Sequence, residues 1–100
     1  MNIHKLRKNI DEIDKALLKL FEKRMKNSIQ IAKYKIAHHQ NVKDLKREKE
    51  IFKIIQNSSN EKFIEENMLL FSVIMYISKN LQHKKIKSMN SKKFKGAKKK

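Results

Sequence analysis

Residues 3–35 read IHKLRKNIDEIDKALLKLFEKRMKNSIQIAKYK, a stretch in which apolar side chains recur every three or four positions. This spacing places them on one face of an α-helix. In the first half of the stretch, the face is made of Ile3, Leu6, Ile10, Ile13, Leu17 and Leu20. The pattern predicts one long helix from about Ile3 to His39.

The predicted first helix is too long to be covered by its own chain. At a rise of 1.5 Å per residue it would extend roughly 50 Å. A compact domain of this size has a diameter of only about 34 Å. The apolar face of the helix therefore predicts contact with a second subunit, most simply in an intertwined two-fold dimer.

The composition indicates an all-helical protein with a single domain. One hundred residues with 39% hydrophobic content suit one domain with a small core. The chain has no proline and one glycine, so the turns of a multi-stranded sheet are missing. It has no cysteine, which fits a reducing cytosol. No stretch is apolar enough for a membrane span or a signal peptide, so we expect a cytoplasmic protein without a membrane partner.

A second, shorter helix is expected after the first. It begins near Val42 or Lys43, and its apolar face carries Leu45, Phe52 and Ile55. The sequence QNSSN that follows is rich in polar turn residues, which predict the end of this helix.

A third helix is expected from about Glu61 to Lys84. Two residues compete to cap its start, because Ser58 has capping-box spacing to Glu61 and Asn60 directly precedes the helix. Apolar residues continue at helical spacing to about Leu81 and then become sparse.

The positive charge of the chain is concentrated at its C-terminus. The formal net charge is +16, and residues 84–100 supply nine lysines and no acidic residue. We therefore expect a domain over residues 1–83, followed by a disordered basic tail over residues 84–100. The other basic residues are spread over several helix faces, so we do not expect nucleic acid as the main partner. Contact of the tail with nucleic acid or an acidic partner stays open.

Polar side chains interrupt the apolar face of each predicted helix. Arg24 and Lys35 continue the face of the first helix, and Glu48 lies within the face of the second. In the third helix, the apolar stripe continues as Ser78 and Gln82. An unpaired polar group on a buried face costs kilocalories, so these groups must meet one another, water or a ligand. We expect all of them to converge on one cavity.

The arginines are suited to bind a small anion. The chain has 23 lysines but only three arginines, Arg7, Arg24 and Arg47. Arginine binds a carboxylate or phosphate through two parallel hydrogen bonds, which lysine does not. Arg24 and Lys35 point the same way about 16 Å apart, and an anion could lie between them. Arg7 lies about 25 Å before Arg24 along the helix, so it cannot reach the same cavity but could reach that of a partner in an antiparallel dimer.

Four segments resemble the all-helical class of chorismate mutases: LRKNIDEIDKALLKLFEKRM at 6–25, KYK at 33–35, VKDLKREKE at 42–50 and SKNLQ at 78–82. The resemblance covers about residues 3–83 and leaves out the basic tail. It implies three helices per chain and an intertwined homodimer with two active sites. Each site would rearrange chorismate to prephenate, in phenylalanine and tyrosine biosynthesis, without a cofactor or a metal.

The resemblance also implies a role for each polar position. Arg24 and the partner subunit's Arg7 would hold the substrate's carboxylates. Lys35 and Gln82 would donate hydrogen bonds to the ether oxygen of the breaking bond, and Glu48 would hold the ring hydroxyl. The remaining matched site positions are Asp44, which would act through its backbone, Arg47, and Ser78, which would lie near a carboxylate.

Other interpretations stay open from the sequence alone. A related fold with a similar site carries out isochorismate-pyruvate lysis, and sequence motifs separate the two activities imperfectly. A polar residue on a helix face can also set register or oligomeric state, and Glu48 could simply pair with Arg47 or Lys35. From a different class, the chain could be a basic helical nucleic-acid-binding protein, whose salt-sensitive binding would depend on residues 84–100.

Overall fold

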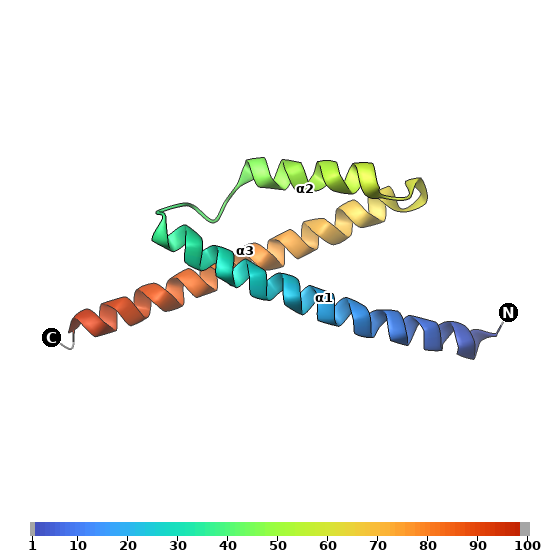
Figure 1. Cartoon of the computed structure of the whole chain (residues 1–100), viewed down its shortest axis with the longest axis horizontal. Helices are drawn as coiled ribbons and strands as arrows, with labels where there is room; N and C mark the ends of the chain where they lie inside the picture. Colours follow the sequence, from blue (N-terminus) through green and yellow to red (C-terminus); the bar gives the residue numbers. More distant parts are fainter. Residues whose placement is uncertain (1, 99–100) are drawn as a thin grey trace.

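The computed structural model describes residues 2–98, and the side chains of residues 2–91, as three α-helices joined by short connections (Figure 1). The helices are α1 (Ile3–Ala37), α2 (Leu45–Ser58) and α3 (Ile64–Lys98), with a single 3-10 turn, η1 (Glu61–Phe63), before α3. Residues 2–98 contain no strand. The predicted all-helical class with three helices is therefore confirmed. No helix in this part of the chain is long and apolar enough to cross a membrane.

α1 is one uninterrupted helix of 35 residues, as the sequence predicts. At its start, the Asn2 side chain accepts a hydrogen bond from the N–H of His4 at 2.9 Å, which caps the helix. At its end, His39 adopts a left-handed conformation with φ of 53°. The N–H of Gln40 then donates to the carbonyl of Lys35 at 2.8 Å. This turn directs the chain toward α2.

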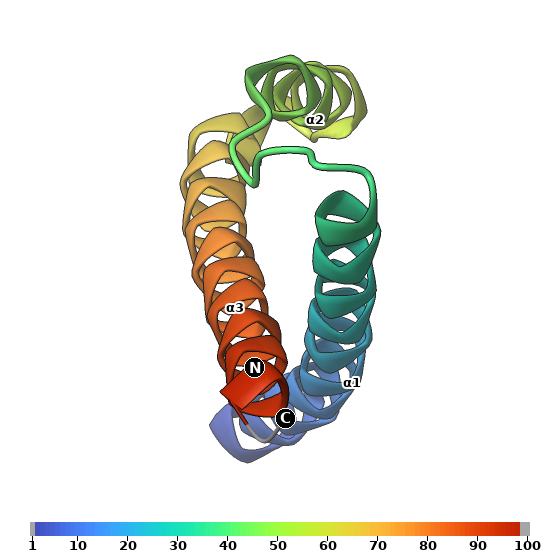
Figure 2. The same ribbon diagram turned by 90° about the vertical axis from the view of Figure 1, so that its left-hand side faces the viewer.

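α3 is the central element of the fold. It packs against both α1 and α2, and it crosses α1 near the middle of the view in Figure 1. α2 lies along the first part of α3, and Figure 2 shows α2 at one end of the pair formed by α1 and α3. The three helices therefore converge on one region, where α1 and α3 cross and α2 covers one side.

Small side chains allow the close crossing of α1 and α3. Ser28 and Ala32 lie one turn apart on α1, and both are buried. The Ser28 hydroxyl forms hydrogen bonds with the Ser78 hydroxyl and, at 3.4 Å, with its carbonyl oxygen on α3. Helix axes can approach closely only where the side chains between them are small. This crossing fixes the second half of α1 relative to α3.

The apolar face in the first half of α1 is exposed in the single chain. Its large side chains, Ile3, Leu6, Ile10, Ile13, Leu17 and Leu20, are each at least 41% exposed. The radius of gyration is 18.4 Å, compared with about 13 Å for a compact chain of this length. The chain thus leaves this face uncovered, as the sequence analysis expects, and the second subunit that would cover it stays a prediction.

α2 begins two to three residues later than the sequence predicts, at Leu45 instead of Val42 or Lys43. The cause is its N-cap, because the Asp44 carboxylate accepts a hydrogen bond from the N–H of Arg47 at 3.0 Å. Asp44 is therefore held at the mouth of α2, and the first turn of the helix carries Arg47.

The next helical segment is capped by Asn60, the second of the two residues that the sequence suggests. The Asn60 side chain accepts a hydrogen bond from the N–H of Lys62 at 3.0 Å. Ser58 is instead the last residue of α2. The capping-box interpretation of Ser58 and Glu61 is therefore wrong, because α2 continues far enough to include Ser58.

α3 continues beyond its predicted end near Lys84 and reaches Lys98. The sequence analysis predicts a disordered tail over residues 84–100, whereas the structure extends the helix through most of it; residues 99 and 100 lie outside the described residues. Lysine has a high helix propensity, and this segment has no proline to end the helix. Loss of the apolar pattern therefore does not by itself end the helix.

Candidate active site

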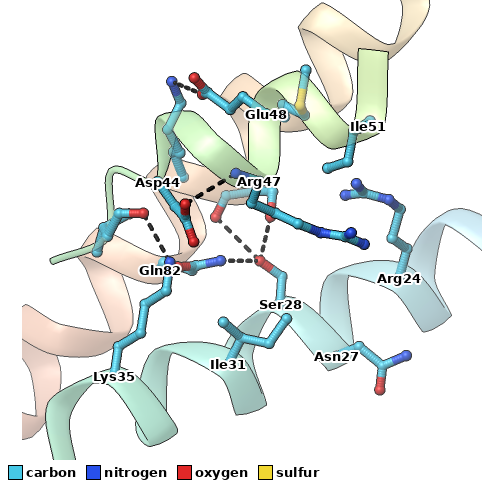
Figure 3. Close-up of a pocket in the computed structure, with 14 residues that line it drawn as sticks. Arg24, Asn27, Ser28, Ile31, Lys35, Asp44, Arg47, Glu48, Ile51 and Gln82 are labelled. Atoms are coloured by element: carbon cyan, nitrogen blue, oxygen red, sulfur yellow. Dashed lines mark hydrogen bonds and ion pairs between the residues drawn. The ribbon is translucent and has the colours of Figure 1, made fainter. Parts of the chain in front are cut away.

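A cavity of about 400 Å³ lies where the three helices converge (Figure 3). Seven of the eight residues that the sequence analysis selected line its wall: Arg24, Lys35, Asp44, Arg47, Glu48, Ser78 and Gln82. They come from α1, α2, α3 and the connection before α2. The expectation that the polar interruptions of three apolar faces meet in one cavity is therefore confirmed.

Arg7 is the selected residue that the structure does not bring to this cavity. It lies in the first half of α1 and is exposed. Seventeen residues of helix separate it from Arg24, a distance of about 25 Å along the axis. Within one chain, Arg7 therefore cannot contribute to the same site.

A row of hydrogen bonds runs along one wall of the cavity (Figure 3). The Lys35 ammonium donates to the carbonyl of Val42 at 2.8 Å and to Oε1 of Gln82 at 3.4 Å. The amide nitrogen of Gln82 donates to the hydroxyl of Ser28 at 2.9 Å, and Ser28 in turn contacts Ser78. Gln82, Ser28 and Ser78 are all buried. The network therefore holds Lys35 and Gln82 side by side in fixed positions.

Both of these side chains keep a hydrogen-bond donor for a ligand. An ammonium group has three N–H donors and a primary amide has two. In the part of the chain that the structure describes, Lys35 uses two of its donors and Gln82 uses one. At least one N–H on each side chain therefore remains available to a ligand.

Arg24 and Arg47 bring two positive charges close together. Their guanidinium groups point toward each other from α1 and α2 (Figure 3). Burial lowers the pKa of Arg24, and the positive charge of Arg47 lowers it further. Among the ion pairs of the described residues, Arg47 pairs with the exposed Glu50 at 3.2 Å, and none includes Arg24. An anion between the two guanidinium groups would offset their repulsion.

Glu48 forms an ion pair with Lys79 across the interface between α2 and α3. The Lys79 ammonium lies 2.9 Å from Oε1 of Glu48, and both residues line the cavity. The sequence analysis considered Arg47 or Lys35 as partners of this carboxylate, and the structure instead pairs it with Lys79. Arg47 and Lys35 are therefore left for other interactions.

The charged side chains of the cavity wall are Arg24, Lys35, Arg47, Lys79, Asp44 and Glu48. Four cations and two carboxylates give the wall a formal net charge of +2. A cavity of this charge complements a small molecule with two negative charges. The arrangement therefore combines a site for a dianion with two hydrogen-bond donors at one position on its wall.

The sequence pattern did not single out three polar residues that line the cavity, Asn27, Ser28 and Lys79. Ser28 lies four residues after Arg24 and seven before Lys35, so the same helical spacing could have indicated it. Lys79 directly follows Ser78 and lies beside the apolar stripe of α3, not on it. In a chain with 23 lysines, no sequence signal distinguishes this one.

The fold and the site define a small helical domain whose cavity is built for an organic dianion. Residues 6–83 match the family model described as chorismate mutase type II. The chain therefore belongs to the chorismate mutase type II family and is an isomerase that acts on chorismate. Comparisons with curated proteins and with solved structures gave no significant match. The family match gives no support to the lyase or nucleic-acid-binding interpretations.

We predict that Ser28→Ala destabilises the protein by about 1–2 kcal/mol, because it leaves the buried amide of Gln82 without its acceptor. The measurement is the free energy of unfolding in urea, with all variants at the same protein concentration. Ser72→Ala is the matched control, since the Ser72 hydroxyl is exposed and bonds only within its own helix. Equal stabilities of the two variants would contradict the role of Ser28.

Proposed function

We propose that the cavity is the active site, in which chorismate is rearranged to prephenate, and that this reaction serves phenylalanine and tyrosine biosynthesis in the cytoplasm. The observation that carries the proposal is the cavity wall with net charge +2 and two adjacent donors, Lys35 and Gln82. An assay of chorismate loss by the purified protein, with prephenate identified as the product, tests it. The same assay with isochorismate would detect lyase activity.

The reaction needs no nucleophile. It therefore suits a site that offers hydrogen-bond donors and cations. An intramolecular Claisen rearrangement breaks a carbon–oxygen bond and forms a carbon–carbon bond within one molecule. The enzyme must fold the substrate into a chair-like geometry, and fixing that geometry lowers the entropic part of the barrier. It must also stabilise the negative charge that builds on the ether oxygen.

Lys35 and Gln82 are proposed to stabilise this developing charge. Their remaining N–H groups can both donate to the ether oxygen, and the network with Val42 and Ser28 holds them in place before the bond breaks. Donors that need no reorganisation during the reaction stabilise the transition state more than the bound substrate. We therefore assign Lys35 and Gln82 mainly to turnover.

Arg24, Arg47 and Ser78 are proposed to hold the carboxylates of the substrate. The two guanidinium groups face one another across the cavity, and a carboxylate between them would satisfy both. These charges are present in the substrate as well as in the transition state. We therefore assign these residues mainly to binding and folding of the substrate.

Glu48 is proposed to accept a hydrogen bond from the ring hydroxyl of chorismate. Its Oε1 is bonded to Lys79, which leaves Oε2 as an acceptor. Asp44 is proposed to support the same end of the substrate through its backbone at the mouth of α2. The substrate would thus be held at its carboxylates, its ether oxygen and its ring hydroxyl.

We further propose that the protein is a homodimer in which each site receives Arg7 from the partner. The exposed apolar face of the first half of α1 supports a second copy, because such a large face is unstable in water. If two copies pair these faces in antiparallel order, Arg7 of the partner subunit approaches the cavity of the first chain. It would add a further guanidinium group for a substrate carboxylate.

We predict that Lys35→Ala lowers kcat by about 100- to 1000-fold, because it removes one donor to the developing charge. Spectrophotometric measurement of chorismate loss checks this. Lys33→Ala is the control, since Lys33 is an exposed lysine two residues earlier and outside the cavity wall. Unchanged turnover in a folded Lys35→Ala protein would contradict the assignment.

We predict that Gln82→Glu confines good activity to acidic pH. A carboxyl group can donate a hydrogen bond only when protonated, and an ordinary glutamate is protonated below about pH 4.3. Burial of this position favours the protonated acid, whereas the neighbouring Lys35 ammonium, 3.4 Å from Oε1, favours the ionised form, so the midpoint of the activity loss reports the balance of the two effects. The profile of kcat against pH for both proteins checks this, and an unchanged profile would count against Gln82 as a donor.

We predict that Arg7→Ala and Arg24→Ala are each inactive but recover activity when their chains are mixed and allowed to exchange. One of the two sites in a heterodimer then has both arginines, so roughly a quarter of wild-type activity returns. Native mass spectrometry confirms the exchange. Heterodimers without activity would place Arg7 outside the partner's site.

A further inference from the structure

We propose that Lys79 is a positioning residue of this active site: it holds the Glu48 carboxylate in place and offsets its negative charge toward the dianionic substrate. The inference rests on the proposed function of the cavity. Neither the sequence pattern nor the chorismate mutase resemblance selects Lys79. It follows from the ion pair that the structure forms at the cavity wall.

The ion pair is partly protected from water. The Lys79 ammonium lies 2.9 Å from Oε1 of Glu48, and the Glu48 side chain is only 24% exposed. Figure 3 shows Glu48 on α2, with a dashed line at its carboxylate that marks this ion pair. Water and salt screen such a pair less than one on the open surface. The Lys79 side chain is 38% exposed, so the pair is partly screened by solvent but stays closer to the cavity than a pair on the open surface.

The negative charge of Glu48 opposes binding of an anionic substrate, and the ammonium group of Lys79 offsets this charge. A carboxylate in the wall repels an anionic substrate, and each negative charge of the substrate at about 5 Å weakens binding about fourfold even at the dielectric constant of water. Inside a cavity the effect is larger. The Lys79 ammonium offsets this charge and leaves the second oxygen of Glu48 free to accept from a hydroxyl group.

Lys79 also ties the first turn of α2 to the rest of the protein. The apolar contacts of α2 lie further along the helix and include the buried Ile55, whereas Leu45 in the first turn is exposed. Among the hydrogen bonds and ion pairs of the described residues, the contact between Lys79 and Glu48 is the one that joins α2 to another helix. This turn also carries Arg47, so Lys79 supports two residues of the site.

Without Lys79, the Glu48 carboxylate would need another cation. The other cations of the wall on α1 and α2 are Arg24, Lys35 and Arg47. In our proposal, each of these cations binds the substrate. If the Glu48 carboxylate paired with one of them, it would compete with the substrate for that cation. Loss of Lys79 should therefore weaken substrate binding first, because the proposed role of Lys79 acts through Glu48 and the other cations of the wall.

The test is Lys79→Met, which keeps most of the side-chain length but removes the charge. We expect KM for chorismate to rise about tenfold, with kcat within about twofold of wild type. Lys79→Arg, which keeps the positive charge, should restore KM to within about threefold of wild type. Lys84→Met is the matched control, since Lys84 is an exposed lysine of the same helix outside the cavity wall. If Lys79→Met does not fold, Lys79→Gln carries the same expectation.

A double-mutant cycle with Glu48 separates positioning from direct binding. In the Glu48→Gln protein no charge needs to be offset, so adding Lys79→Met should leave KM unchanged within about twofold. If Lys79 binds the substrate itself, KM rises by the same factor in both backgrounds, and the inference is wrong. The inference is also overturned if the single variant Lys79→Met leaves KM unchanged. It is likewise overturned if Lys79→Met and the control Lys84→Met lower kcat by the same factor. An inactive wild-type protein would instead overturn the proposed function.

Discussion

Buried polar side chains must have hydrogen-bond partners, and this requirement determines how the helices pack around the cavity. Each helix carries polar residues on its inner face, and an isolated chain segment could not bury them without cost. Ser28, Ser78, Gln82 and Lys35 satisfy one another where α1 and α3 cross. The crossing is close because the side chains between the helices are small. The same contacts that hold the helices together thus orient the donors of the site.

A second constraint comes from the length of α1. Its second half packs on α3 and lines the cavity, whereas its first half extends away with an exposed apolar face. The small core of one chain, with Met25, Ala32 and Met75 among its buried residues, cannot cover this face. Folding and site assembly are therefore linked in our proposal, because the second chain that covers α1 would also bring Arg7 to the cavity.

The cavity wall combines an excess of positive charge with carboxylates, and in our proposal these two features bind an anion and accept from a hydroxyl group. The wall has a net charge of +2, but it includes two carboxylates. Asp44 caps α2 and Glu48 pairs with Lys79, so each carboxylate is engaged by the protein. Arg24 and Arg47 instead face one another, and burial lowers the pKa of Arg24. Among the described residues, no ion pair joins Arg24, Arg47 or Lys35 to a carboxylate of the wall, so in our proposal these cations serve the substrate.

Helical spacing was enough to predict the helical class, the three helices and seven residues of the cavity, because it places Arg24, Lys35 and Gln82 on faces that must be buried. The partner of Glu48 could be found only from the packed helices, since the pairing with Lys79 depends on how α2 lies on α3. The structure also decided that α3 continues past Lys84, where apolar spacing no longer indicates a helix but lysine still favours one. Periodicity reports which face of a helix is buried, whereas partners across an interface depend on the packing between helices.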